Sequence, residues 1–161
     1  MKGGKQVAGF RHEWKIEINA MDAAVIRSRL RAVAKEDAHG RGGKYEIRSL
    51  YFDNLKDKAL REKIDGVNTR EKFRIRYYNK DISLIKLEKK RKYNGLTGKE
   101  SVLLSAEEVQ KIAEGDNSFM VHSGKKLLAE LYSKMQAQGW LRKQLWTIQG
   151  RLLCIRRETS A

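Results

Sequence analysis

The sequence predicts a mixed α+β fold with a mainly antiparallel sheet. Two observations carry this prediction. Charged and apolar residues alternate along several short segments, as in strands with one exposed face, and segments with helical periodicity lie between and after them. The chain has 161 residues, enough for one domain with a hydrophobic core but too few for two of ordinary size.

Composition narrows the class of protein further. The 35 Lys and Arg residues outnumber the 20 Asp and Glu residues, so the formal net charge is +15, which indicates an anionic partner. A 40% share of hydrophobic residues excludes general disorder. We expect no membrane span, because there is no apolar run of about 18 residues, and no secretory signal. The single cysteine excludes an intramolecular disulfide and a cysteine-based zinc site, and it favours the cytoplasm.

The first third of the chain predicts a strand, a helix, a second strand and a short helix. Residues 1–9 are expected to form a flexible arm. From Phe10, apolar and charged residues alternate through Ile18 as in a strand, and Asn19 is a suitable N-cap for a helix over residues 21–34. After a glycine-rich break at residues 40–43, the pattern predicts a strand over 45–52. Asp53 can then cap a short helix that ends at Gly66.

The middle of the chain predicts a pair of strands followed by two helices. A strand over residues 72–77 and another over 82–92 are separated by an Asn-Lys-Asp turn. Gly95 and Gly98 indicate a loop before a short run that ends at Leu104. Ser105 and Glu108 have the spacing of a capping box, which predicts a helix to about residue 113. A further helix is expected over residues 124–138, with Gly139 as its stop.

Positive charge is concentrated between Arg70 and Lys99, where eleven Lys or Arg residues stand against three Asp or Glu residues. Lys72, Arg74 and Arg76 alternate with apolar residues, so their side chains share one strand face. Neighbours on that face lie about 6.5–7 Å apart. Two such cations repel by about 0.6 kcal/mol in water and about 2.5 kcal/mol at an effective dielectric constant of 20. An enclosed face would therefore need a bound polyanion or interleaved carboxylates, whereas a fully solvated face is the alternative.

Several roles remain open for individual residues. Glu13 and Glu88 stand among basic residues, so they could hold a divalent cation or form cross-strand ion pairs. Nucleic-acid binding also fits a basic sheet, although no helix-turn-helix, zinc-finger or ribonucleoprotein signature is present. The three histidines are scattered without metal-ligand spacing, and no Ser-His-Asp arrangement is evident.

An ordered series of motifs resembles one known family. The series comprises RHEWK (residues 11–15), IRSLYFDN (47–54), REKIDGV (61–67), REKFRIRYY (70–78) and IKLEKKR (85–91). Over residues 10–139 the series is similar to the VTC domain. This is the polyphosphate polymerase domain of the triphosphate tunnel metalloenzymes, a CYTH-like superfamily. The first motif has Arg11 where the related CYTH branch has a glutamate in ExExK, which favours the VTC branch.

The resemblance implies an antiparallel β barrel that forms a tunnel with flanking helices, of which this chain would hold the first half. It implies a bacterial, cytoplasmic phosphotransferase that moves the γ-phosphate of ATP onto polyphosphate with Mn²⁺ or Mg²⁺. Lys15, Arg74, Arg76 and Lys90 are the implied catalytic phosphate ligands. Binding of another polyanion without turnover, and inorganic triphosphatase activity, are the alternatives. Further substrate-binding candidates are Lys63, Lys99, Arg48, Arg70, Lys72 and Lys86, with a structural role as the alternative for Arg48 and Arg70.

Residues 140–161 do not fit this pattern. They show no clear alternation and no family motif, and the whole chain lacks proline. Read from the third base of the Trp140 codon, permitted codons can spell AAKATVDYTREAFVYPPGNVR, which resembles the family's next segment. We therefore hypothesise a frameshifted tail and a truncated tunnel, with a divergent C-terminal helix as the alternative.

Overall fold

The structure, a computed structural model, describes residues 8–11, 14–36, 44–151 and 153–154. An antiparallel six-stranded sheet in the order β1-β6-β5-β4-β3-β7 forms its centre, and β2 pairs with β8 in a separate two-stranded sheet. The large sheet is open, with β1 and β7 at its edges. Its strands are β1 (Ala8–Arg11), β3 (Tyr45–Asp53), β4 (Arg70–Tyr78), β5 (Asp81–Tyr93), β6 (Leu96–Leu104) and β7 (Leu141–Gly150). The small sheet joins β2 (Lys35–Glu36) and β8 (Leu153–Cys154).

Two tight turns connect the three central strands. Asn79 and Lys80 both have positive φ, at 52° and 60°, between β4 and β5. Asn94 and Gly95 have φ of 45° and 82° between β5 and β6. Two successive residues with positive φ match the twist of adjacent strands, so these turns fix the register of the whole β4-β5-β6 unit. Residues 96–98 continue the ladder as part of β6, so the loop expected at Gly98 is wrong.

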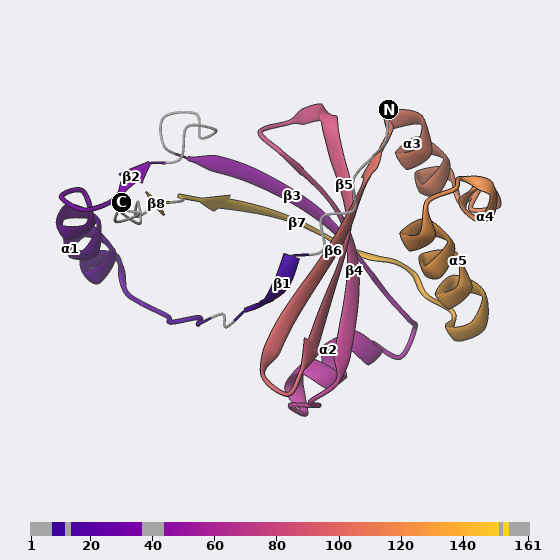
Figure 1. Cartoon of the computed structure of the whole chain (residues 1–161), viewed down its shortest axis with the longest axis horizontal. Helices are drawn as coiled ribbons and strands as arrows, with labels where there is room; N and C mark the ends of the chain where they lie inside the picture. The colour runs from indigo at the N-terminus through magenta and orange to yellow at the C-terminus, as the bar shows by residue number, and fades with distance from the viewer. Residues whose placement is uncertain (1–7, 12–13, 37–43, 152, 155–161) are drawn as a thin grey trace, which may run out of the picture.

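Helices cover one face of the large sheet, as Figure 1 shows for α3 (Ala106–Glu114), α4 (Phe119–His122) and α5 (Lys126–Gln138). Ser105 and Glu108 form the expected capping box of α3, and Gly139 ends α5 with φ of 64°. The core lies between these helices and the sheet. It is built from Phe52, Phe73, Ile75, Ile85, Leu87, Leu104, Ile112, Met120, Leu127, Leu128, Leu131 and Trp140. The ring of Trp140 packs edge-on against Phe73, with centroids 5.7 Å apart.

A smaller lobe lies where β3 begins and β7 ends, and it contains α1 (Ala20–Leu30) with the β2-β8 pair. Asn19 caps α1 as expected, since its Oδ1 accepts from the backbone N–H of Asp22 at 2.8 Å. The helix ends at Leu30, earlier than expected. Residues 14–19 form no strand, which corrects the prediction of a strand through Ile18, and their side chains are exposed.

The C-terminal region is a strand where the sequence showed no alternation. Residues 141–150 form β7, which pairs with β3 along its full length. Nearly all its side chains are exposed, so neither face imposes an apolar pattern. The alternative of a divergent helix after Gly139 is therefore wrong for these residues. The frameshift hypothesis stays a prediction, which sequencing of the gene across the Gly139 codon would test.

Candidate functional site

The face of the sheet opposite the helices carries a dense set of basic side chains. The register places Lys72 opposite Lys90, Arg74 opposite Glu88, and Lys90 opposite Lys99. Side chains alternate along a strand, and those between these residues, such as Phe73, Ile75 and Leu87, point to the helix-covered side, so these residues share the other face. We call it the basic face. Its charged strand residues are Arg70, Lys72, Arg74, Arg76, Lys86, Glu88, Lys90, Lys92 and Lys99.

Charge on the basic face is poorly balanced. Lys72, Lys90 and Lys99 form a row across three adjacent strands, which lie about 4.7–4.9 Å apart. If their ammonium groups stayed as close as the strands, each neighbouring pair would repel by about 3 kcal/mol at an effective dielectric constant of 20. Bending of the side chains relieves part of this repulsion. Glu88, which contacts Lys99, offsets another part, and an anion that bridges the row would offset more.

Lys72 lies among several other cations on this face. Burial lowers the pKa of Lys72 below its ordinary value, and the nearby charges of Lys63, Arg70 and Lys15 lower it further. Lys63 comes from the exposed side of α2 (Lys58–Ile64), and Lys15 comes from the segment after β1. Both residues were predicted to belong to the site. Their influence on Lys72 brings them to the same region of the molecule.

Glu88 is the acidic residue at the centre of the basic face. It is 1% exposed, and its Oε2 accepts from Arg74 Nε at 2.7 Å and lies 2.7 Å from Arg74 Nη2. Its Oε1 lies 2.5 Å from Lys99 Nζ. Burial raises the pKa of Glu88, but the charges of Arg74 and Lys99 outweigh burial and hold this pKa below its ordinary value. Glu88 is therefore an ionised partner in a cross-strand ion pair, which was one of the two roles considered for it.

Ser49 and Tyr51 of β3 also belong to the basic face, although the sequence predicted only that they lie in a strand. Ser49 Oγ accepts from Arg76 Nε at 2.9 Å, and Tyr51 Oη accepts from Arg74 Nη1 at 3.1 Å. Burial raises the pKa of Tyr51, but the hydrogen bond and charge of Arg74 reverse this, so the pKa is lowered. Both side chains hold an arginine in place. The register with β4 would have shown their position, because Ser49 pairs with Arg76 and Tyr51 with Arg74.

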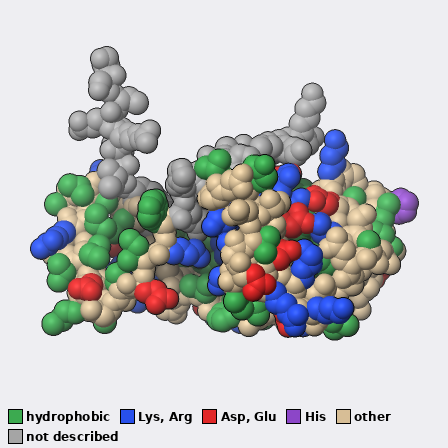
Figure 2. Space-filling model, turned by 90° about the horizontal axis from the view of Figure 1, so that it is seen from below, with side chains coloured by type: hydrophobic (Ala, Val, Ile, Leu, Met, Phe, Trp, Pro, Cys, Tyr) green, Lys and Arg blue, Asp and Glu red, His purple; other side chains and the backbone are tan. Residues whose placement is uncertain are grey.

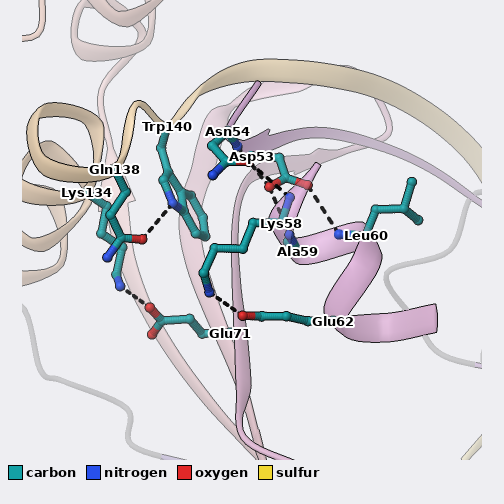
Figure 3. A network of polar contacts seen from close by, with 10 residues as sticks. All are labelled: Asp53, Asn54, Lys58, Ala59, Leu60, Glu62, Glu71, Lys134, Gln138 and Trp140. Carbon is teal, nitrogen blue, oxygen red and sulfur yellow. Dashed lines mark hydrogen bonds and ion pairs between the residues drawn. The ribbon is translucent and has the colours of Figure 1, made fainter. Parts of the chain in front are cut away.

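Asp53 accepts hydrogen bonds from the first turn of the short helix, as the sequence predicted. Its Oδ1 accepts from the backbone N–H groups of Asn54 and Ala59, at 2.8 and 2.9 Å, and its Oδ2 accepts from that of Leu60 at 3.3 Å (Figure 3). These bonds satisfy donors in the first turn of α2. Asp53 thereby attaches α2, which carries Lys63, to the end of β3.

Two predicted site residues need separate mention. Arg48 points to the helix-covered side, where its Nη1 donates to Tyr77 Oη at 3.2 Å and its Nε donates to Thr147 Oγ1 at 3.4 Å. The structural alternative considered for Arg48 therefore describes it, and the sheet separates it from Arg74 and Arg76. Glu13 lies outside the described residues. The remaining predicted residues, including Lys86 opposite Arg76, lie on or beside the basic face.

The helix-covered side handles charge in a different way. Lys89 is 4% exposed and contacts both Glu71, at 3.1 Å, and Glu130. Glu71 also pairs with Lys134, as Figure 3 shows. Arg91 pairs with Glu100 at 2.6 Å. Lys89, Arg91 and Lys134 on this side thus each have a carboxylate partner, whereas one carboxylate serves the centre of the basic face.

The described residues do not fit a divalent metal held by the protein. Mg²⁺ and Mn²⁺ are bound through oxygen ligands, among which carboxylates are prominent. Within the described strands β3 to β6, Glu88 is the one carboxylate in the middle of the basic face. Two cations, Arg74 and Lys99, already contact it. No group of three His, Cys, Asp or Glu residues suitable for a metal exists in the described part of the chain.

The outer surface shows two further features. Viewed from the α2 end of the sheet, the α1 lobe at the left exposes many hydrophobic side chains, and Lys and Arg side chains lie where this lobe meets the sheet (Figure 2). Trp14, Ile16 and Met21 are 86%, 79% and 78% exposed. None of the described helices is both long enough and apolar enough to cross a membrane.

Fold and face together define an α+β protein with an open antiparallel sheet that has one strongly basic face. Comparison with protein families specifies it: the VTC domain matches residues 10–145. The chain therefore belongs to the VTC family, which is related to polyphosphate polymerases. The match extends beyond the boundary expected at Gly139. A search of curated proteins finds no relative that matches.

Proposed function

We propose that the basic face binds a chain of phosphates and that this binding serves the transfer of a nucleotide γ-phosphate to polyphosphate. The observation that carries the proposal is the charge imbalance across the sheet. Within residues 70–76 of β4, 86–92 of β5 and 97–101 of β6, eight basic side chains and one carboxylate share the basic face, whereas the basic groups Lys89, Arg91 and Lys134 on the other side have carboxylate partners. Family membership supports phosphate as the anion.

The length of the face suits an extended ligand. Arg70, Lys72, Arg74 and Arg76 follow one another along β4 at intervals of about 6.5–7 Å, so they span about 20 Å. A linear polyanion lying along β4 can reach all four groups. A single phosphate group can contact only neighbouring ones. Guanidinium groups suit bidentate contacts with phosphate oxygens, and lysines act as point charges.

In the proposed reaction, a terminal oxygen of the polyphosphate chain attacks the γ-phosphorus of ATP. The bond from that phosphorus to the β–γ bridging oxygen breaks, and ADP leaves. The contribution of this chain is positioning and charge neutralisation, because phosphoryl transfer needs little covalent chemistry from the protein. Arg74 and Arg76 would stabilise charge on the transferred group, while Lys15, Lys72 and Lys90 would hold the neighbouring phosphates. Mn²⁺ or Mg²⁺ would enter with the nucleotide phosphates, and the single cysteine supports a reducing, cytoplasmic setting.

A non-catalytic polyanion-binding role is the second candidate, because the described residues supply no carboxylate set for a metal. Incubation of the chain with ATP and Mn²⁺, followed by quantification of polyphosphate, separates the two. Synthesis that is lost in an Arg74→Ala, Arg76→Ala double variant supports transfer. Binding of polyphosphate without synthesis supports the binding role. Failure to bind polyphosphate at low salt overturns both.

A further inference from the structure

We propose that Glu88 is an internal counter-ion of the basic face, which competes with a bound polyanion for Arg74 and Lys99 and so limits how tightly the face binds. This inference rests on the proposed function, because it concerns regulation of the same face. It also follows from the poor fit of Glu88 to a metal site. A carboxylate whose two oxygens each contact a cation already has the surroundings of a bound anion.

The guanidinium of Arg74 shows how Glu88 and a phosphate compete. Its Nε and Nη2 both contact Glu88 Oε2 at 2.7 Å, and its Nη1 donates to Tyr51 at 3.1 Å. All three nitrogens therefore have a partner within the protein. A phosphate that binds Arg74 side-on, through Nε and Nη2, must displace Glu88, whereas an end-on phosphate can use only the second N–H of Nη1 and of Nη2 and then lies close to the Glu88 charge. Lys99 Nζ, 2.5 Å from the other oxygen, faces the same choice.

Glu88 also opposes a polyanion through its charge. It is a negative charge that stays ionised, at the centre of the face where phosphates would lie. A neutral side chain of the same shape would remove this repulsion. Arg74 would keep its orientation, because Tyr51 still accepts from Nη1 and a glutamine oxygen can still accept from Nε. The gain in attraction is therefore not offset by loss of the arginine's geometry.

The test compares Glu88→Gln with two controls in the binding of medium-chain polyphosphate, at low salt with EDTA present. We expect Glu88→Gln to bind about tenfold more tightly than the wild type, since one unit of negative charge is removed from contact distance. Glu100→Gln makes the same change in net charge on β6 but affects the Arg91 pair on the helix-covered side, so it should bind like the wild type. Glu88→Asp keeps the charge but loosens the contacts with Arg74 and Lys99, so it should gain less than Glu88→Gln.

Each outcome decides one point. If folded Glu88→Gln binds no more tightly than the wild type, or if Glu100→Gln gains as much, the inference is overturned and the proposed function stands. If neither the wild type nor Glu88→Gln binds polyphosphate, the proposed function fails and the inference fails with it. Should Glu88→Gln not fold, NMR of the wild type decides. Addition of polyphosphate should shift the Glu88 carboxyl carbon and the Arg74 Nε–H signals, and unchanged signals would overturn the inference.

Discussion

Replacement of Arg76 by Gln isolates one phosphate contact of the basic face. Arg76 is half-buried, its Nε donates to Ser49, and its guanidinium carbon lies 5.9 Å from the centre of the Tyr78 ring. Glutamine removes the charge but keeps a polar group of moderate length. No described carboxylate pairs with Arg76, so the substitution leaves no known acidic partner without its cation. The loss in binding should then reflect the phosphate contact itself.

The magnitude follows from counterion release. Each neutralised phosphate contributes about 0.7–0.9 to the slope of log K against log salt concentration. If release supplies the whole contribution of one contact, a slope of about 0.8 corresponds to about an elevenfold loss at about 0.05 M salt and about a fourfold loss at about 0.2 M. Arg76→Gln should therefore bind polyphosphate more weakly, with the difference from the wild type shrinking as salt is added.

A salt series of polyphosphate binding isotherms measures this slope. Arg91→Gln is the matched control, because it removes the same charge from the neighbouring strand β5 but on the helix-covered side, where Arg91 pairs with Glu100. The control should leave the slope unchanged. An Arg76→Gln slope equal to that of the wild type would refute the placement of Arg76 in the binding face. An equal reduction by Arg91→Gln would show that only net charge matters.

Three further predictions follow from the same structure. Lys72→Met should raise the free energy of unfolding near pH 7, because the lowered pKa of Lys72 means that folding disfavours its charged form. This gain in stability should shrink as the pH rises from the lowered pKa toward the ordinary value of 10.5. Urea unfolding at several pH values measures the gain. Removal of divalent metal with EDTA should change polyphosphate affinity by less than about twofold in calorimetry, since the described residues offer no group of carboxylates or histidines to hold a metal; a larger loss would show that a metal takes part in binding. Phe73→Ala should lower the free energy of unfolding by about 3–5 kcal/mol in urea titrations, because the ring is fully buried against Trp140; a loss below about 1 kcal/mol would contradict the assigned core.

The basic face was largely predictable because basic and apolar residues alternate in both β4 and β5. Phe73 and Ile75 alternate with Lys72, Arg74 and Arg76 in the sequence, and the structure buries the first pair and leaves the basic set on the opposite side. When one face of a strand is buried, the alternation of apolar and charged residues alone shows which side chains face the core. The antiparallel pairing and the capped helices α1 and α3 follow from equally local signals.

The role of Arg48 could not be obtained in this way. Around it, β3 mixes polar and apolar residues on both faces, so its own alternation does not choose a side. Only the register with β4, which pairs Arg48 with Tyr77 and Ser49 with Arg76, separates the two faces. Register is a property of two strands, and a single strand's pattern does not contain it.

Two other errors have the same physical origin. Residues 14–18 alternate like a strand but find no partner, and their side chains remain exposed. Residues 141–150 do not alternate, yet they form β7 because the backbone of β3 offers them a full ladder. At the edges of this sheet few side chains are buried, so backbone pairing rather than the side-chain pattern decides which residues form a strand.

The two tight turns beside β5 have a consequence for tolerance to mutation. All eight cations of the basic face lie on strands joined by these turns, within residues 70–104. A slip of one residue in a strand exchanges its two faces. Insertion of a single amino acid at residues 79–80 or 94–95 would thus force a choice between breaking the turn and driving lysines and arginines into the core. Substitutions along this unit can change its affinity gradually, whereas length changes at the turns should be all but forbidden.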